Sequence, residues 1–250
     1  MTSHRPSTQS LFGLPVFSSG TAEFLELLCS DHPPKTIGYL NAHTVNLAHE
    51  DPKYREMLMA LDVLYADGLA VVKTSRKARR ALVERINAGD FLPRFLWMCA
   101  ARGYAVAVVG GVPGVAAKAS ERLNATLPSA VIQYHHHGYI VQDAAQRAEM
   151  LAEIRTLNPR FLLLGLGSPH QERLSLEWSK ELPNTTIWCV GALMEYFSGQ
   201  RKRAPLILRV LGLEWVFRLA LEPRRLAVRY LIGNPKYLLR ERRWLKSLYK

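Results

Sequence analysis

An aspartate between two apolar segments is the residue of this chain best placed to do acid–base chemistry. Asp67-Gly68 follows the apolar residues 61–66 and precedes the apolar residues 69–72. Burial there would raise the pKa of the carboxyl group toward neutrality, so that it could take a proton from a hydroxyl group. The alternative is an ordinary Asp-Gly turn. The first interpretation makes Asp67 a candidate general base.

A second candidate segment combines glycines with an amide and a carboxylate. Residues 165–172 read GLGSPHQE, which places Gly167 ahead of a proline at a predicted helix start and Gln171 and Glu172 in the first turn. Gln171 offers a donor and an acceptor, as a nucleobase or a sugar hydroxyl requires. Glu172 either contacts a ligand or complements the helix dipole.

A glycine-rich loop at residues 110–114, GGVPG, follows a predicted strand and precedes a predicted helix at 115–124. Gly110, Gly111 and Gly114 would let backbone N–H groups approach an anion such as a diphosphate. A tight structural turn is the alternative. The loop has neither the G-x-G-x-x-G spacing of dinucleotide sites nor the G-K-[ST] ending of nucleotide-triphosphate loops.

Positive charge is concentrated at the C-terminal end. The chain has a net charge of +12, and residues 196–250 contain 14 Lys or Arg against 3 Asp or Glu. Arg218, Arg225 and Arg229 are spaced by near-integral helical turns, although Pro223 should divide that segment into two helices. Arginines at this density suit either a solvated face or bidentate capture of phosphate. The aromatic residues among them also suit an anionic membrane surface.

Several other chemistries lack their residues. There is no Asp-x-Asp pair for a divalent cation and no G-x-S-x-G for a serine hydrolase. The run at 135–137 is three histidines without an acidic or cysteine partner at ligand spacing. The three cysteines are far apart and fit neither disulfides nor a zinc site. We therefore expect no metal and no cofactor.

The elements that must position these residues alternate between strand and helix. Apolar runs at 35–40, 104–109, 161–164 and 186–190 each end in glycine or polar turn residues before a helical pattern. This order predicts an α/β fold, with a Rossmann-like parallel sheet flanked by helices and ligand loops at the strand carboxyl ends. The change of charge near 198–205 predicts a catalytic domain over 1–197 and a basic amphipathic helical appendage over 198–250. Pro205 can open a new helix there, at its first turn.

The sequence also carries an expectation about location. Residues 1–10 are polar, so a secretory signal is not supported. The apolar segment 206–221 is interrupted by three charged residues and is too short to span a bilayer. We expect a cytoplasmic protein, peripheral on the inner face of the cytoplasmic membrane.

Taken together, seven blocks in order resemble the WecG/TagA/CpsF glycosyltransferases, known as glycosyltransferase family 26. The resemblance covers roughly residues 38–230. The blocks are NAHTVN at 41–46, ADG at 66–68, ERI at 84–86, GGVPG at 110–114, GLGSPHQE at 165–172, RAP at 203–205, and GLEW at 212–215 with Arg218 and Glu222-Pro223.

The resemblance implies an activity and a set of partners. Family members transfer a sugar, of the N-acetylmannosamine, mannosaminuronic acid or glucose type, from a UDP donor to a polyprenyl-diphosphate-linked acceptor. The transfer is inverting and metal-independent and belongs to cell-surface polysaccharide biosynthesis. It implies further that the appendage completes the active site, and that its arginines close over the diphosphate.

The resemblance also assigns roles to single positions. By this correspondence Asp67 is the catalytic base, and Thr44 and Asn46 belong to the polar substrate pocket. Arg85 and Gln171 contact substrate. The chain departs from the family in having His170 where lysine is common and Gly89 directly before Asp90.

Two other functions are consistent with parts of the chain. A nucleic-acid-binding protein would use the basic tail, but nothing in the body explains such a role, and we expect no nucleic-acid partner. A nicotinamide oxidoreductase would need the missing dinucleotide fingerprint. We hypothesise that the tail lets the chain alternate between a soluble homo-oligomer and a membrane-bound monomer.

Overall fold

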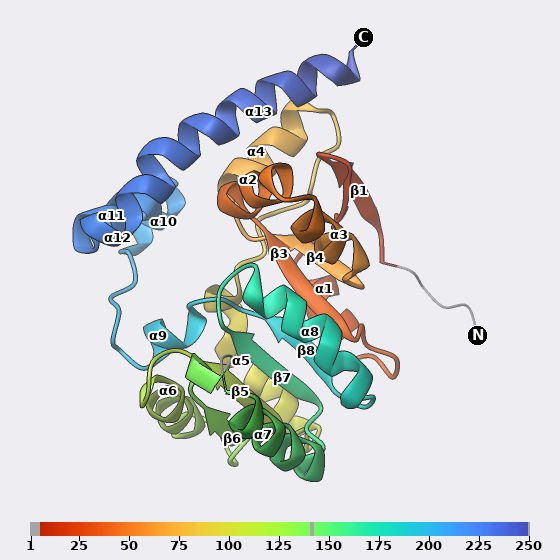
Figure 1. Cartoon of the computed structure of the whole chain (residues 1–250), viewed down its shortest axis with the longest axis vertical. Coiled ribbons are helices and arrows are strands. Elements are labelled where there is room, and N and C mark those ends of the chain that lie inside the picture. The colour runs from red at the N-terminus through yellow and green to blue at the C-terminus, as the bar shows by residue number, and fades with distance from the viewer. Residues whose placement is uncertain (1–5, 141–142, 250) are drawn as a thin grey trace.

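A parallel sheet runs through the centre of the computed structural model, which describes residues 6–140 and 143–249 (Figure 1). Within that range the sheet has six strands in the order β4-β3-β8-β7-β5-β6. This arrangement, with helices on both faces, confirms the predicted Rossmann-like α/β fold. The strands are β3 (Thr36–Leu40), β4 (Val63–Ala66), β5 (Val106–Gly110), β6 (Ile132–His136), β7 (Phe161–Gly165) and β8 (Thr186–Cys189).

The strands lie close to the predicted apolar runs. The predicted run at 104–109 is the one that differs most, because the structure begins β5 at Val106. The Tyr104 N–H donates to the Cys99 carbonyl oxygen at 3.0 Å, so Tyr104 belongs to the turn that follows the preceding helix. All pairings in the sheet are parallel, so the carboxyl ends of the strands meet at one edge.

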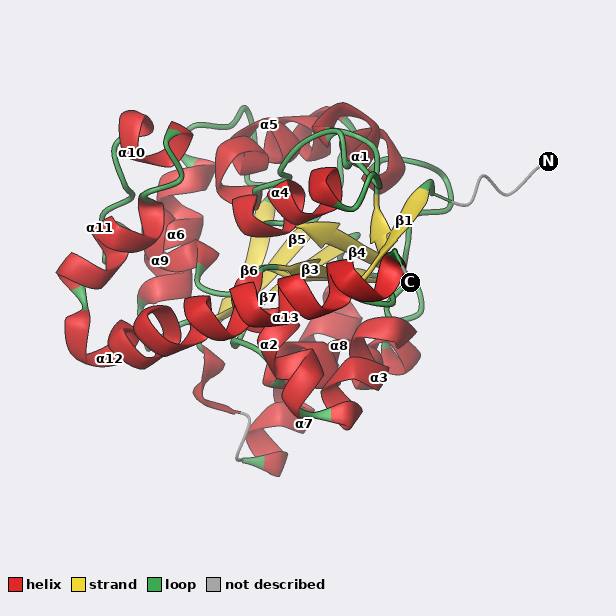
Figure 2. Cartoon of the chain, turned by 90° about the horizontal axis from the view of Figure 1, so that it is seen from above, coloured by secondary structure: helices red, strands yellow, loops and turns green. Residues whose placement is uncertain are grey.

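Two layers of helices cover the sheet (Figure 2). On one face, a core with Trp188 at its centre packs Phe24, Phe91 and Phe95 against it at ring-centroid distances of 5.5 to 5.8 Å. This face carries α1 (Thr21–Leu28), α5 (Ala88–Ala101) and α6 (Val115–Asn124). The opposite face carries α2 (Ala42–Glu50), α3 (Pro52–Ala60), α7 (Ala144–Leu157) and α8 (His170–Glu181).

A short antiparallel hairpin precedes the sheet. Its strands β1 (Thr8–Leu11) and β2 (Leu14–Phe17) are joined at Phe12-Gly13, both with positive φ, as tight hairpin turns require. The segment 1–10 considered above as an export signal lies partly outside the described residues, at 1–5. Helix α4 (Leu69–Lys77) follows β4.

The C-terminal part is a succession of helices, as predicted. After α9 (Leu193–Phe197), residues 198–205 lead without a helix or strand to α10 (Leu206–Val210). Pro205 precedes α10, and Pro223 separates α11 (Glu214–Leu221) from α12 (Pro223–Ala227), both as expected. The π-helix η2 (Val228–Ile232) then leads into α13 (Gly233–Leu248). Whether 198–250 is a domain of its own stays a prediction.

Helix α13 crosses one end of the body and holds the appendage against it (Figure 1). Thr74 Oγ1 on α4 donates to Glu241 Oε1 at 2.6 Å and lies 2.7 Å from the Tyr237 hydroxyl. Lys77 Nζ reaches both carboxylate oxygens of Glu241 at 3.0 Å. Thr74, Tyr237 and Glu241 are all buried, so this contact excludes water and depends on complete pairing.

The lengths and compositions of the helices bear on whether the chain could cross a membrane. Among the described residues, none forms a helix long and apolar enough to cross a bilayer.

Replacing Thr74 with valine should weaken the attachment of α13. The change keeps the shape but removes a donor from the buried Glu241 carboxylate, so the free energy of unfolding should fall by about 1 to 3 kcal/mol. Urea unfolding of both proteins measures this difference. Thr156→Val on the exposed face of α7 is the matched control, because Thr156 Oγ1 bonds only to the Ala152 carbonyl one turn back. Equal losses in the two variants would contradict the role of Thr74.

Candidate functional site

A cavity of about 510 Å³ lies between the carboxyl edge of the sheet and the appendage. Its lining on the body side follows directly after β3, β4 and β8, and the facing side comes from α11, η2 and α13. Strands β3 and β8 are neighbours, but the chain leaves them in opposite directions, toward α2 and toward α9. Such a switch point is where open parallel sheets bind ligands.

Asp67 lies at the end of β4 and lines this cavity. Asn87 Nδ2 donates to Asp67 Oδ1 at 2.8 Å. Burial raises the pKa of Asp67 to about 6; Glu214 adds to the rise, while Arg85, Asn87 and Arg218 oppose it. A carboxyl group with this pKa exchanges its proton near neutral pH, as a general base must. The raised pKa agrees with the expectation from the sequence.

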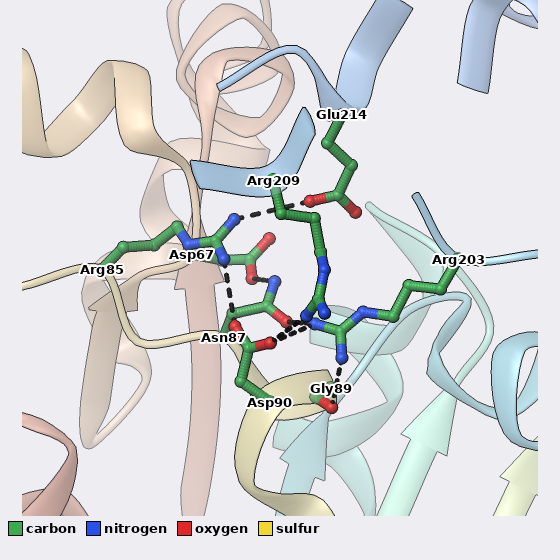
Figure 3. Close-up of polar contacts among 8 residues, drawn as sticks. All are labelled: Asp67, Arg85, Asn87, Gly89, Asp90, Arg203, Arg209 and Glu214. Atoms are coloured by element: carbon green, nitrogen blue, oxygen red, sulfur yellow. Dashed lines mark hydrogen bonds and ion pairs between the residues drawn. The ribbon is translucent and has the colours of Figure 1, made fainter. Parts of the chain in front are cut away.

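Next to Asp67, one carboxylate gathers three arginines (Figure 3). Asp90, in the first turn of α5, accepts from Arg85 Nη2 at 3.0 Å, from Arg203 Nη2 at 2.6 Å and from Arg209 Nη1 at 2.7 Å. Arg203 and Arg209 belong to the C-terminal part and Arg85 to the body. Asp90 therefore joins the two parts of the chain at the rim of the cavity, and Arg85 reaches Glu214 of α11 as well, at 3.5 Å.

Two appendage arginines face the cavity without an acidic partner. Arg218 lies over the Tyr196 ring, with its Cζ 6.0 Å from the ring centroid, and Arg229 lies 5.9 Å from the Tyr230 centroid. Among the described residues no carboxylate forms an ion pair with either of them, and Arg229 Nε is buried without a hydrogen-bond partner. Desolvated guanidinium groups of this kind are poised to bind an anion.

Arg225, the third predicted appendage arginine, lies elsewhere. It pairs with Glu222 through its Nε, its side chain is half exposed, and it is outside the cavity lining. Glu222 in turn accepts from Arg201 at 2.9 Å. The structure therefore brings Arg218 and Arg229 together with Asp67 but does not bring Arg225 to them.

The charge of Arg229 also affects a histidine of the site. His43, in the first turn of α2, lines the cavity. Burial, and then the positive charge of Arg229, lower the pKa of His43 to about 4. The imidazole is therefore neutral at physiological pH and offers one donor and one acceptor rather than a further cation.

Thr44 and Asn46 are predicted in the substrate pocket. In the structure Thr44 caps the start of α2, and Asn46 joins α2 to α13. Thr44 Oγ1 accepts from the Asn41 N–H at 2.8 Å, and the Asn41 side chain accepts from the Thr44 N–H, which closes a capping box at the start of α2. Asn46 Nδ2 donates to the Gly233 carbonyl oxygen at 2.7 Å, and Asn46 Oδ1 accepts from Arg240 at 2.6 Å. Both side chains are buried beside the cavity rather than in its lining.

The predicted substrate residue Gln171 is fully buried behind the cavity wall. Its Nε2 donates to Glu172 Oε1 at 2.9 Å, and its Oε1 accepts from the Gly191 N–H at 3.0 Å. Gln171 thereby fixes the loop after β8 that lines the cavity. Glu172 also accepts from Ser168 at 2.6 Å, and burial raises its pKa. The Gly167 carbonyl oxygen accepts from the Gln171 N–H at the helix start.

The three glycines of the 110–114 loop also lie outside the cavity lining. A Cβ on Gly110 would lie 2.5 Å from the Gly165 carbonyl oxygen, so glycine is needed there for the close approach of β5 and β7. Gly111 and Gly114 adopt positive φ in the turn that begins α6. These contacts are those of the structural turn, the second of the two interpretations of this loop.

The sequence predicts no metal site, and the structure describes residues 6–140 and 143–249 of the chain. In this range no three His, Cys, Asp or Glu side chains come together as a metal site would require. Of the histidines at 135–137, His136 Nδ1 lies 2.9 Å from the His137 carbonyl oxygen, away from the cavity.

Four cavity residues were not singled out from the sequence. They are Asn87, Arg203, Arg209 and Tyr196, which lie 2, 15, 9 and 22 positions from the nearest predicted site residue. The RAP block at 203–205 was the one available signal, since it pairs an arginine with a proline at a predicted boundary. Their convergence depends on how the appendage folds back, which residue spacing does not reveal.

The raised pKa of Asp67 makes the stability of the protein depend on pH. A carboxyl group whose pKa rises on folding stabilises the fold fully only below its unfolded value of 3.8, and this contribution is lost as pH rises through 6. Asp67→Asn should therefore be the more stable protein above pH 6, by up to roughly 3 kcal/mol. Denaturant unfolding of both proteins from pH 4 to pH 8 measures this, and a constant difference would exclude a buried, titrating Asp67.

The whole chain was compared with known families. The match is to the family described as glycosyl transferase WecG/TagA/CpsF, over residues 9–250. It extends beyond the resemblance described above to include β1 and α13. A glycosyl transferase assignment favours sugar transfer over the oxidoreductase and nucleic-acid alternatives, and it agrees with a switch-point cavity that joins a carboxylate to arginines. This chain belongs to the WecG/TagA/CpsF family of glycosyl transferases.

Proposed function

We propose that the protein transfers a sugar from a UDP-sugar to a polyprenyl-diphosphate-linked acceptor, with inversion and without a metal ion. The observation that carries the proposal is the composition of the cavity. A carboxyl group with a pKa of about 6 and two arginines without carboxylate partners line the same cavity. The first suits deprotonation of an acceptor hydroxyl, and the second suit the diphosphate of a donor.

In this mechanism Asp67 is the general base. Its carboxylate takes the proton of the acceptor hydroxyl while that oxygen attacks the anomeric carbon of the donor sugar. The bond from the anomeric carbon to the diphosphate oxygen breaks, and UDP leaves from the opposite face with the bonding electron pair. Attack and departure on opposite faces invert the anomeric configuration.

The leaving diphosphate needs positive charge as its own charge grows. Arg218 and Arg229 supply it in the part of the cavity formed by the appendage. The first turn of α4, at Gly68 to Ala70, also lines the cavity, and Gly68 provides no side-chain cap there. A helix N-terminus favours negative charge, so it complements the two guanidinium groups. Such electrostatic stabilisation is the task that a metal ion performs in other transferases.

The surface of the appendage supports location at a membrane. Apolar side chains on α10, η2 and α13 are exposed in a part of the chain rich in basic residues, where they would cost free energy in water and gain it at a lipid surface. We therefore place the protein on the inner face of the cytoplasmic membrane, where an anionic surface and a polyprenyl-linked acceptor are both within reach. They include Leu206, Ile207, Val228, Leu231, Leu238 and Leu239.

Transfer can be tested with the purified full-length protein. UDP-sugars of the N-acetylmannosamine, mannosaminuronic acid and glucose types are each incubated with a short-chain polyprenyl-diphosphate-N-acetylglucosamine acceptor and EDTA, and the lipid is analysed by mass spectrometry. We expect one donor to increase the lipid mass by one sugar residue. Absence of product with all donors, together with absence of UDP binding, would refute the proposed reaction.

The two roles in the cavity predict different kinetic effects. Asp67→Asn should reduce turnover by about 10²-fold or more while leaving UDP affinity nearly intact, because the amide keeps the shape but cannot take the proton. Arg218→Ala and Arg229→Ala should weaken UDP binding and turnover together. Arg225→Ala removes the same charge from the same part of the chain but outside the cavity, so it is the matched control. Equal loss of UDP affinity in all three arginine variants would assign them a general electrostatic effect instead.

A further inference from the structure

Asn87 lies between the carboxylate of the cavity and an arginine of the segment that leads to the appendage (Figure 3). Its Nδ2 is 2.8 Å from Asp67 Oδ1, and its Oδ1 is 3.0 Å from Arg203 Nη2. Arg203 is held in turn, because its Nη1 donates to the Gly89 carbonyl oxygen at 2.7 Å and its Nη2 reaches Asp90 at 2.6 Å. The three side chains form a continuous hydrogen-bonded chain.

The chemistry of the two ends determines how the amide is oriented. A guanidinium group only donates hydrogen bonds, so the oxygen of the Asn87 amide must face Arg203. An ionised carboxylate only accepts, so the amide nitrogen must face Asp67. Among the hydrogen bonds of the described residues, the one from Arg203 is the only one that Asn87 Oδ1 accepts. Without it, the amide is free to turn its oxygen toward Asp67, where two acceptors would repel each other.

We propose that Arg203 is a positioning residue for Asp67, acting through Asn87, so that the segment joining body and appendage holds the base in its ionised, correctly oriented form. The proposal rests on the proposed function for the role of Asp67, but the hydrogen-bonded chain itself can be tested without turnover. The hydrogen bonds of Arg203 go to Gly89, Asn87 and Asp90. Among the described residues, none of them goes to Asp67, Arg218 or Arg229.

Other charged and titratable groups face Asp67 from several elements and would remain in every variant. Arg85 comes from the loop before α5, and Glu214 and Arg218 come from α11. Tyr65 of β4 and Tyr39 of β3 lie on the strand side, and both sense the charge of Asp67. Arg85 and Glu214 also engage each other at 3.5 Å. The effect of Arg203 on the pKa of Asp67 through Asn87 therefore has to be distinguished from the effect of simply removing a nearby positive charge.

Arg209 offers that separation. Arg209 Nη1 donates to the same Asp90 oxygen at 2.7 Å, and Arg209 also lines the cavity from the C-terminal part of the chain. It has the same charge as Arg203 and the same ion-pair partner, but it makes no hydrogen bond to Asn87 among the contacts of the described residues. Arg203→Gln and Arg209→Gln therefore remove equal charges beside Asp90, and only the first should release the Asn87 amide.

The primary measurement is the pKa of Asp67 in the full-length protein. The protein is labelled with ¹³C at the aspartate carboxyl carbons, the Asp67 signal is assigned from its absence in Asp67→Asn, and its shift is followed by NMR from pH 4 to pH 8. Asn87→Ala removes a hydrogen bond to the charged form, so the pKa should rise by about 0.5 to 1 on the pH scale. Arg203→Gln should raise it by most of that amount, and Arg209→Gln by clearly less.

The double variant gives the decisive comparison. If Arg203 acts through Asn87, adding Arg203→Gln to Asn87→Ala should produce no additional shift. A full additional shift in the double variant, or equal shifts for Arg203→Gln and Arg209→Gln, would overturn the proposal in favour of a direct charge effect. Arg203→Lys, which keeps the charge but not the forked geometry, is the substitute if Arg203→Gln does not fold, and it too should raise the pKa.

The activity test distinguishes this proposal from the proposed reaction. With a donor and acceptor that support transfer, the acidic limb of the profile of kcat/KM against pH should move upward in Arg203→Gln, with a loss of about three-fold at pH 6 and little loss at pH 8. An equal loss at both pH values would show a merely structural effect and overturn the proposal. Normal turnover of Asp67→Asn would refute the base, while the NMR shifts would still decide whether Arg203 orients Asn87.

Discussion

The pKa of the buried Asp67 carboxyl group depends on polar groups that come from two distant parts of the chain. Burial alone would keep Asp67 protonated well above its ordinary pKa, whereas Asn87, Arg85 and Arg218 bring the value back to about 6. Two of these groups depend on the appendage, since Arg218 is part of it and Asn87 is held by Arg203. The packing of α13, the ion pairs of Asp90 and the path of residues 198–205 all serve to maintain that environment.

The arginines of the C-terminal part include two groups, those that form ion pairs and those that lie over aromatic rings. Those at the junction of body and appendage form ion pairs with Asp90, and Arg225 forms one with Glu222, so they hold the structure together. Arg218 and Arg229 are placed over aromatic rings instead of beside carboxylates. An aromatic ring stabilises a cation without competing for its hydrogen-bond donors.

The sequence predicted the sheet, the helix breaks at Pro205 and Pro223, and the position of Asp67, because each depends on local pattern. It did not distinguish the glycines at 110–114 as packing residues, since the close approach of β5 to β7 is a tertiary contact. Nor did it indicate that Gln171 supports the loop after β8 from behind, because burial at a helix start depends on which strand lies next to it. Asn87 and Arg203 meet across 116 positions, and no spacing rule reaches so far.

The order of the elements along the chain also has a consequence during synthesis. All strands of the sheet precede residue 190, so the strands are synthesised before the appendage. Arg203, Arg218 and Arg229 emerge afterwards, and only then can the cavity close around Asp67. A chain that ends before these residues therefore lacks the wall of the cavity that α11, η2 and α13 supply.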